Sequence, residues 1–298
     1  MGESLAMLTD LYLYATLAGL AVVLTCGVLS VLVVVKRLGF VGQGISHSAF
    51  GGVGVAALLA AHGIAAPGSI AEFGVIVAFC VAAALGMAAV ADKRTVPTDT
   101  AIGLFLVASM AAGAILVQVS RGVAIANGRA PDVRSWESIL FGSILLAGPT
   151  DAVVGWVCAA LVLGLVWWQR RKLLFWAFDE DSARAFGVPT GAAKVLLMIV
   201  LSLAVVTAMK LVGVVLATAM LVLPGATALK LTDRLWWSVG LSCAAGVLGL
   251  LGGLVLSLWM DWSPGPSVVV VMTGLFAAAM LAERLAGVRG GVGGAGRA

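Results

Sequence analysis

Long apolar blocks, separated by short charged, proline or glycine clusters, make up most of the chain. A helix that crosses a membrane needs about 20 mostly apolar residues, and seven blocks come close to or exceed that length. They cover approximately residues 11–35, 44–62, 70–91, 99–119, 150–169, 235–259 and 266–286. The breaks between them contain Pro67, Pro97, Pro149 and Pro264. Because a helix satisfies its backbone hydrogen bonds internally in lipid, the pattern predicts an all-α, polytopic membrane protein.

The stretch from residue 192 to 230 allows two interpretations. It is long enough for two short crossings, or for one crossing and a re-entrant segment, because Lys210 and Pro224 interrupt an otherwise apolar run. The first interpretation gives nine crossings and the second gives eight. We therefore expect 8 to 9 transmembrane helices.

The distribution of basic residues favours nine crossings. With nine crossings, 14 of the 18 basic residues fall on one side, which the positive-inside rule makes cytoplasmic. The 14 are Lys36, Arg37, Lys93, Arg94, Arg170, Arg171, Lys172, Arg184, Lys194, Lys230, Arg234, Arg284, Arg289 and Arg297. The chain is thus expected to be a multi-pass cell-membrane protein with its N-terminus outside and its C-terminus inside.

Composition agrees with lipid as the solvent. Hydrophobic residues make up 62% of the chain, charged residues 11%, and the mean hydropathy is +1.13, whereas soluble domains average about 25% charged residues. These values exclude a disordered chain, a secreted disulfide scaffold and a soluble enzyme with one anchor. The net charge of +4 does not indicate nucleic acid, because the basic residues lie at the ends of apolar blocks.

The cysteines and the first apolar block suggest no special chemistry. The cysteines lie singly in different apolar segments, without the spacing of a zinc site or a redox pair, so we interpret them as small buried hydrophobes. They are Cys26, Cys80, Cys158 and Cys243. The first block follows Glu3 and Asp10 and is too long for a signal-peptide core, so it is expected to be a retained helix.

Residues 1–286 are predicted to form one transmembrane domain that carries two distinctive loops. Residues 170–192 form a cytoplasmic loop with acidic residues beside a short helix-forming stretch, typical of a docking element. The loop from 120 to 149 is external, and its piece from Trp136 to Leu146 is interpreted as an interfacial helix. The tail, residues 287–298, is Gly-rich and predicted to be disordered.

A polar cluster opens the second apolar block. On a helix, Gln43, His47, Gly51, Gly54 and Leu58 share one face, since they are three or four residues apart. An imidazole inside the membrane suits a borderline divalent metal, and the glutamine would add an oxygen ligand. The glycines would let an ion or another helix approach closely. The alternative is a neutral, hydrogen-bonded packing histidine, and the residues alone favour neither interpretation.

Other polar positions favour structural roles. His62 lies at the outer end of its block, where an interfacial histidine is expected. Asp99 follows Pro97 in the first turn of a predicted helix, where capping and the helix dipole favour a carboxylate. Pro224 and Gly225 lie late in a small-residue helix, where they would either free carbonyls to line a cavity or simply kink the helix.

Sequence motifs for energy coupling and catalysis are absent. The chain contains no G-x-x-x-x-G-K-[ST] loop, no HExxH and no G-x-S-x-G. It also has no row of buried acids suited to a proton relay. We therefore expect no enzyme, but either a passive path or the membrane half of a machine that is powered elsewhere.

Six segments, in the same order, resemble permeases of zinc-, manganese- and iron-type ABC importers. The segments are KRLGFVGQGISHSAFGGVGVA from Lys36, PTDTAIGL from Pro97, WESILFGSIL from Trp136, DSARAFGVPTGAAKVLL from Asp181, AMKLVGVVLATAMLVLPGATA from Ala208 and SPGPSVVV from Ser263. The resemblance implies a fold like that of the vitamin B12 and siderophore importers. It implies two permeases, identical or paired, around a central pathway that works by alternating access.

The resemblance also implies partners and cargo. ATP would be bound by a separate ATP-binding cassette subunit inside, and a metal-binding protein would dock outside. The cargo would be zinc, manganese or iron, with no permanently bound cofactor. An ATP-independent secondary transporter or channel for a cation is the alternative, although neither inverted repeats nor more buried charge is evident. A membrane enzyme would need a second buried ionisable residue near His47.

Particular residues acquire roles through the resemblance. His47 becomes a metal ligand, Asp99 matches a recurrent aspartate, and Gln43 stands where the family often has an aspartate, so it is a weaker ligand. The ATPase-coupling element would contain Asp179, Glu180, Asp181, Ala183 and Gly187. Pathway or packing roles would fall to Gly51, Gly54 and Pro224.

Overall fold

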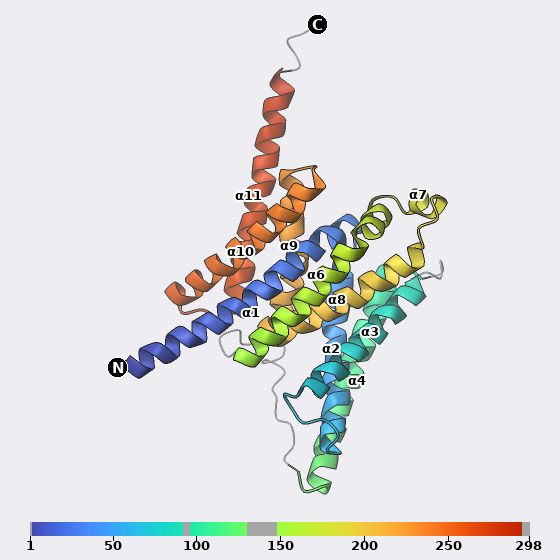
Figure 1. The fold of residues 1–298 in the computed structure, drawn as a ribbon, viewed down its shortest axis with the longest axis vertical. Coiled ribbons are helices and arrows are strands. Elements are labelled where there is room, and N and C mark those ends of the chain that lie inside the picture. The colour runs from blue at the N-terminus through green and yellow to red at the C-terminus, as the bar shows by residue number, and fades with distance from the viewer. Residues whose placement is uncertain (1, 92–95, 130–147, 294–298) are drawn as a thin grey trace.

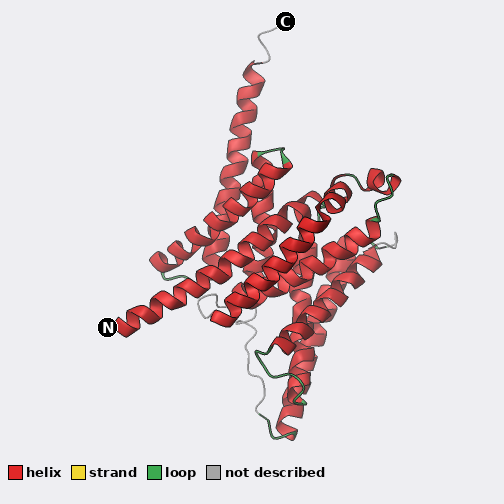
Figure 2. Ribbon diagram, viewed as in Figure 1, coloured by secondary structure: helices red, strands yellow, loops and turns green. Residues whose placement is uncertain are grey.

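The computed structural model describes residues 2–91, 96–129 and 148–293, and every regular element in these ranges is a helix (Figure 2). The helices are α1 (Gly2–Val35), α2 (Gly39–Ala61), α3 (Ile70–Ala91), α4 (Thr98–Ala126), α6 (Pro149–Phe178), α7 (Glu180–Ala185), α8 (Thr190–Val212), α9 (Val214–Leu231), α10 (Leu235–Met260) and α11 (Pro264–Gly293). Within the described residues, nine of them are long and apolar enough to cross a membrane, and α7 is the short exception. The predicted all-α, polytopic class with 8 to 9 membrane helices is confirmed.

The ambiguous stretch after residue 190 forms two helices. They meet at Gly213, whose φ of 84° lies in the left-handed region that favours glycine. Lys210, which interrupts the apolar run, places its Nζ 3.0 Å from Oδ1 of Asp151 at the start of α6. The carboxylate of Asp151 compensates the charge of Lys210 at the end of α8. This lysine is therefore compatible with two separate crossings.

Several boundaries differ from the predicted ones. The helix α4 continues to residue 126 instead of 119, and α6 continues to 178 instead of 169. Basic residues do not end a helix, because their long side chains reach the interface while the backbone stays helical. The 30 residues of α6 therefore extend about 45 Å, longer than a hydrocarbon core of about 30 Å.

Two predicted segments fall partly or wholly outside the described residues. The interfacial helix from Trp136 to Leu146 lies within 130–147, outside the description. The helix α11 runs to Gly293 and so enters the predicted Gly-rich tail, while residues 294–298 lie outside the described part. Disorder of those last residues stays a prediction.

The helix α1 occupies the centre of one half of the molecule. It packs against α6, α8, α9 and α10, and Figure 1 shows it running alongside α6. The helix α2 organises the other half, because it packs against α3 and α4 and also reaches α8 and α9. Four helices therefore contact α2, whose first turns keep part of their surface exposed.

Contacts between helix ends define one side of the molecule, here called the α7 side. Lys36 after α1 pairs with Glu180 of α7, and Lys194 at the start of α8 donates to the Ala88 carbonyl late in α3. Lys230 at the end of α9 pairs with Glu283 late in α11. The first two contacts bring the ends of α1, α3 and α8 close to α7, and the third joins the ends of α9 and α11.

The opposite side is defined in the same way. Arg129, after α4, donates to the Ala61 carbonyl at the end of α2 over 2.9 Å, and Asn127 donates to the same carbonyl. Lys210 and Asp151 join the end of α8 to the start of α6. Successive helices thus alternate in direction, as expected for a chain that crosses a membrane repeatedly.

Candidate functional site

One face of α2 carries the polar residues singled out in the sequence. Gln43 is exposed, as is Phe40 one turn earlier, whereas His47 is half-buried. Gly51 and Gly54, further along the same face, are buried. The α2 strip, defined as Phe40, Gln43 and His47, is therefore open at the start of the helix and closes where the glycines begin.

His47 has an unusual environment for a histidine inside a membrane protein. Its Nδ1 atom is buried, and in the described part of the chain nothing hydrogen-bonds to it. The ring stacks on Phe50, with centroids 6.0 Å apart and an interplanar angle of 18°. A buried polar atom without a partner costs about 1–3 kcal/mol. A packing histidine is normally hydrogen-bonded, whereas the described residues offer this nitrogen no partner.

The glycines of this face receive neighbouring helices. A Cβ atom added at Gly51 would lie 2.5 Å from the Phe79 ring of α3, and one added at Gly54 would lie 2.9 Å from Gly113 of α4. Such spacing leaves no room for a side chain, so α2 receives the Phe79 ring of α3 at Gly51 and makes close backbone contact with α4 at Gly54. The two glycines therefore pack helices in this structure, which was one of the two roles expected for them.

Asp99 lies exposed in the first turn of α4, after the N-cap residue Pro97. Its helix touches α2 one turn later, where a Cβ atom added at Gly44 would lie 2.7 Å from Ile102. The carboxylate thus belongs to the end of α4 that packs near Gln43. Within the described residues, however, no three His, Cys, Asp or Glu side chains gather into a group that could hold a metal.

The predicted coupling segment forms the short helix α7. Oδ1 of Asp179 accepts a hydrogen bond from the Ser182 backbone N–H over 2.9 Å, so this aspartate caps the helix. Ala183 is fully buried. Gly187 has a φ of 77°, and its N–H bonds to the Arg184 carbonyl at 3.1 Å, which ends the helix in a left-handed turn.

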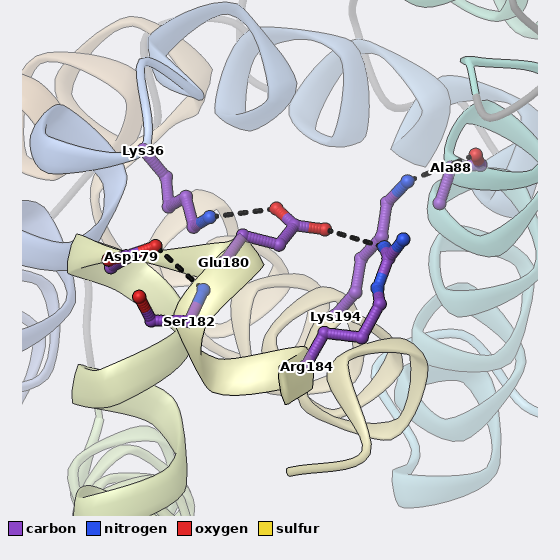
Figure 3. Close-up of polar contacts among 7 residues, drawn as sticks. All are labelled: Lys36, Ala88, Asp179, Glu180, Ser182, Arg184 and Lys194. Carbon is purple, nitrogen blue, oxygen red and sulfur yellow. Dashed lines mark hydrogen bonds and ion pairs between the residues drawn. The ribbon is translucent and has the colours of Figure 1, made fainter. Parts of the chain in front are cut away.

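Glu180 lies between Lys36 and Arg184 (Figure 3). Its Oε2 lies 3.0 Å from Nζ of Lys36, and its Oε1 lies 3.7 Å from Arg184. The side chain of Lys36 is only 16% exposed, and its ammonium group lies 4.2 Å from the centre of the Trp176 ring. The ion pair connects α7 to the junction of α1 and α2, three turns before His47 along the chain.

The acidic residues of α7 differ in their electrostatics. Burial raises the pKa of Glu180, but the hydrogen bond and charge of Lys36, together with Trp176 and Arg184, outweigh it and hold the pKa below its ordinary value. The hydrogen bonds from Ser182 lower the pKa of Asp179. Asp181 is exposed, and so are Arg184 and Phe186, which is 79% exposed. One face of the segment therefore anchors it and the other is available to a partner.

Pro224 is buried in α9 and is supported by α1. The Ser30 hydroxyl accepts a hydrogen bond from the Gly225 N–H over 2.7 Å and donates to the Val222 carbonyl over 3.2 Å. The two bonds fall on either side of the proline, which has no N–H of its own. The sequence did not reveal the hydrogen bonds of Ser30 or the ion pair of Lys36, because each residue meets a partner more than a hundred residues away in the chain.

Comparisons with known proteins agree with these features. Residues 9–283 match the family described as the ABC 3 transport family. The chain is 34% identical over 274 residues to the "Manganese transport system membrane protein MntC" of Halalkalibacterium halodurans, covering 92% of this chain and 88% of that protein. It is 27% identical over 262 residues to the "High-affinity zinc uptake system membrane protein ZnuB" of Haemophilus influenzae, covering 88% and 94%.

A solved structure shares the fold. It is described as "PsaBC from Streptococcus pneumoniae in complex with Fab", and it matches with a TM-score of 0.74 and 28% sequence identity over 90% of both chains. The family match over residues 9–283 includes both α2 and α7.

Proposed function

The chain belongs to the ABC 3 transport family, and we propose that it is the permease subunit of an ATP-driven importer for a divalent transition metal. The names of its relatives refer to manganese, zinc and iron. The sequence lacks a phosphate-binding loop, so ATP hydrolysis belongs to a separate subunit. The permease provides the path, and its partners provide the energy and the delivery of the ion.

The observation that carries the metal proposal is Nδ1 of His47, which has no hydrogen-bond partner among the described residues. An unprotonated imidazole nitrogen is a common ligand of manganese, zinc and iron. The ion is cargo, so a site that holds it weakly and incompletely suits transport better than a closed cage. Gln43 would add a neutral oxygen and Asp99 a charged one at the entrance of the α2 strip.

A second permease, identical or paralogous, would complete the pathway. The described residues of one chain do not bring three strong metal ligands together, and the α2 strip is open on one side. Two strips that face each other across an interface would double the number of ligands. Alternating access would then open this shared path to one side of the membrane at a time.

The ATPase subunit would dock on the outward face of α7. That face combines the charges of Asp181 and Arg184 with the exposed ring of Phe186. Movement of the ATPase would reach the pathway through Glu180 and Lys36, because Lys36 directly precedes the turn into α2. The α7 side would accordingly be cytoplasmic, with the N-terminus outside and the C-terminus inside. The metal-binding protein would dock on the opposite side.

Reconstituted transport tests this function. The chain, its ATPase and its binding protein would be placed in proteoliposomes, and uptake of manganese, zinc and iron would be followed with and without ATP. We expect ATP-dependent uptake of at least one of the three ions. Uptake of the same size without ATP would instead indicate a channel or secondary carrier, and uptake of none would contradict the metal proposal.

A further inference from the structure

An apolar groove of about 490 Å³ opens between α1, α6 and α10, away from the α2 strip. Its lining includes Val28, Gly164, Leu173 and Trp236, and Arg170 is the one charged residue among the residues that line it. There is open space beside Gly164, because a Cβ atom added there would meet no described atom within 4 Å. The volume lies in the range of about 300–1,000 Å³ that is typical of ligand pockets.

The groove lies where the hydrocarbon of the membrane meets the headgroups. If α6 enters the membrane at Pro149, about 20 residues of helix place the other boundary near Arg170. Trp167 and Trp236 are 61% and 62% exposed, and their rings lie 6.4 Å apart at the groove. Exposed tryptophans gather at membrane interfaces, so they mark the same depth as the helix length does.

Arg170 has hydrogen-bonding capacity to spare. Its Nη1 donates to the Trp167 carbonyl over 3.1 Å, and its guanidinium carbon lies 4.1 Å from the centre of the Trp167 ring. Within the described residues it forms no ion pair with a carboxylate. A guanidinium has five N–H donors and matches phosphate oxygens in pairs.

The surroundings of Arg170 are basic. Arg171 and Lys172 follow it on α6 and are exposed. Arg234, also exposed, lies two residues before Trp236, with Asp233 as its acidic neighbour. Positive charge therefore collects at the mouth of a groove whose walls are apolar, which is the complement of an anionic amphiphile.

We propose that this groove binds one acyl chain of an anionic glycerophospholipid from the leaflet on the α7 side, with the lipid phosphate on Arg170. A soluble anion would gain nothing from the apolar walls, and a zwitterionic lipid would bring its own positive charge to a basic mouth. The site goes beyond metal transport and rests only on insertion of the chain in a membrane.

Lipid binding to the purified, delipidated complex of this chain with its ATPase provides the test. Native mass spectrometry would follow titration with phosphatidylglycerol and, separately, with phosphatidylcholine. Arg170→Ala should weaken phosphatidylglycerol binding about tenfold, the effect of losing one charge-assisted pair. The matched control Arg171→Ala, whose exposed side chain does not line the groove, should change binding less than about twofold.

A second pair of variants tests the acyl chain independently of charge. Gly164→Leu should fill the groove and abolish binding of this lipid, while Gly240→Leu should not, although a Cβ atom at either glycine meets no described atom within 4 Å. Equal effects within either pair would overturn the proposal. So would equal affinity for the two lipids, displacement of phosphatidylglycerol by inorganic phosphate, or a copurified peptide or second copy of the chain in the groove.

Discussion

The hydrogen bonds between Ser30 and α9 should stabilise the fold measurably. The change Ser30→Ala removes a fully buried hydroxyl. This hydroxyl lies 2.7 Å from the Gly225 nitrogen and 3.2 Å from the Val222 oxygen. Side-chain hydrogen bonds between membrane helices contribute about 0.6 kcal/mol on average and at most about 1.7 kcal/mol. Two such bonds at the interrupted ladder of Pro224 should therefore contribute about 1–2 kcal/mol.

The assay is the free energy of unfolding of the purified chain in mixed micelles, measured by denaturant titration. Ser120→Ala is the matched control, because Ser120 is also buried but, among the described residues, its hydroxyl bonds only to the Val117 carbonyl of its own helix, over 2.8 Å. That control should change the free energy of unfolding by less than about 0.5 kcal/mol. Equal losses for the two variants would refute the idea that Ser30 braces the proline in α9.

Three further outcomes are expected. Gly113→Ala should destabilise the chain by about 1–3 kcal/mol, because the new Cβ atom would lie 2.6 Å from the Phe50 carbonyl carbon. Gly103→Ala should not destabilise it, because a Cβ atom there would meet no described atom within 4 Å. Comparison of the melting temperatures of the two variants tests this difference. Because the pKa of Glu180 is lowered in the folded chain, its stabilisation is complete above its ordinary value of 4.5 and is lost as pH falls through the lowered pKa. The difference in melting temperature between wild type and Glu180→Gln should therefore shrink toward zero as the pH drops below 4.5, and a constant difference would contradict the ion pair. Lys36→Ala should reduce the metal transported per ATP hydrolysed while ATP hydrolysis continues, and an unchanged ratio in proteoliposomes would exclude Lys36 from coupling.

Eight or nine membrane helices, in the order that the structure shows, could be predicted from the sequence because lipid imposes a simple length requirement. The block from residue 70 to 91 has the same bounds as α3. The ends of the helices were harder to predict, as the continuation of α6 past Arg170 shows. A charged cluster marks the membrane boundary, but nothing in that cluster breaks a helix, so the pattern underestimates its length.

The candidate site was only partly accessible to sequence reasoning. The periodicity of Gln43, His47 and the glycines correctly places them on one face of α2, because helical spacing is a local property. Which of them meet a neighbouring helix is not local, and the approach of Gly113 to Gly54 depends on the folded arrangement. The Lys36–Glu180 pair spans 144 residues of sequence, and no local signal distinguishes that lysine from other basic residues at helix ends.

The central claim, that His47 takes part in metal transport, is tested most directly by ATP-driven uptake in proteoliposomes with the two histidines of the chain changed in turn. His47→Ala should abolish uptake of the transported ion while the permease still assembles with its ATPase. His62→Ala is the matched control, since its Nδ1 is already hydrogen-bonded to the Leu58 carbonyl at 2.9 Å on an exposed part of the chain, and it should transport normally. Normal uptake by the His47 variant would contradict the role of this residue.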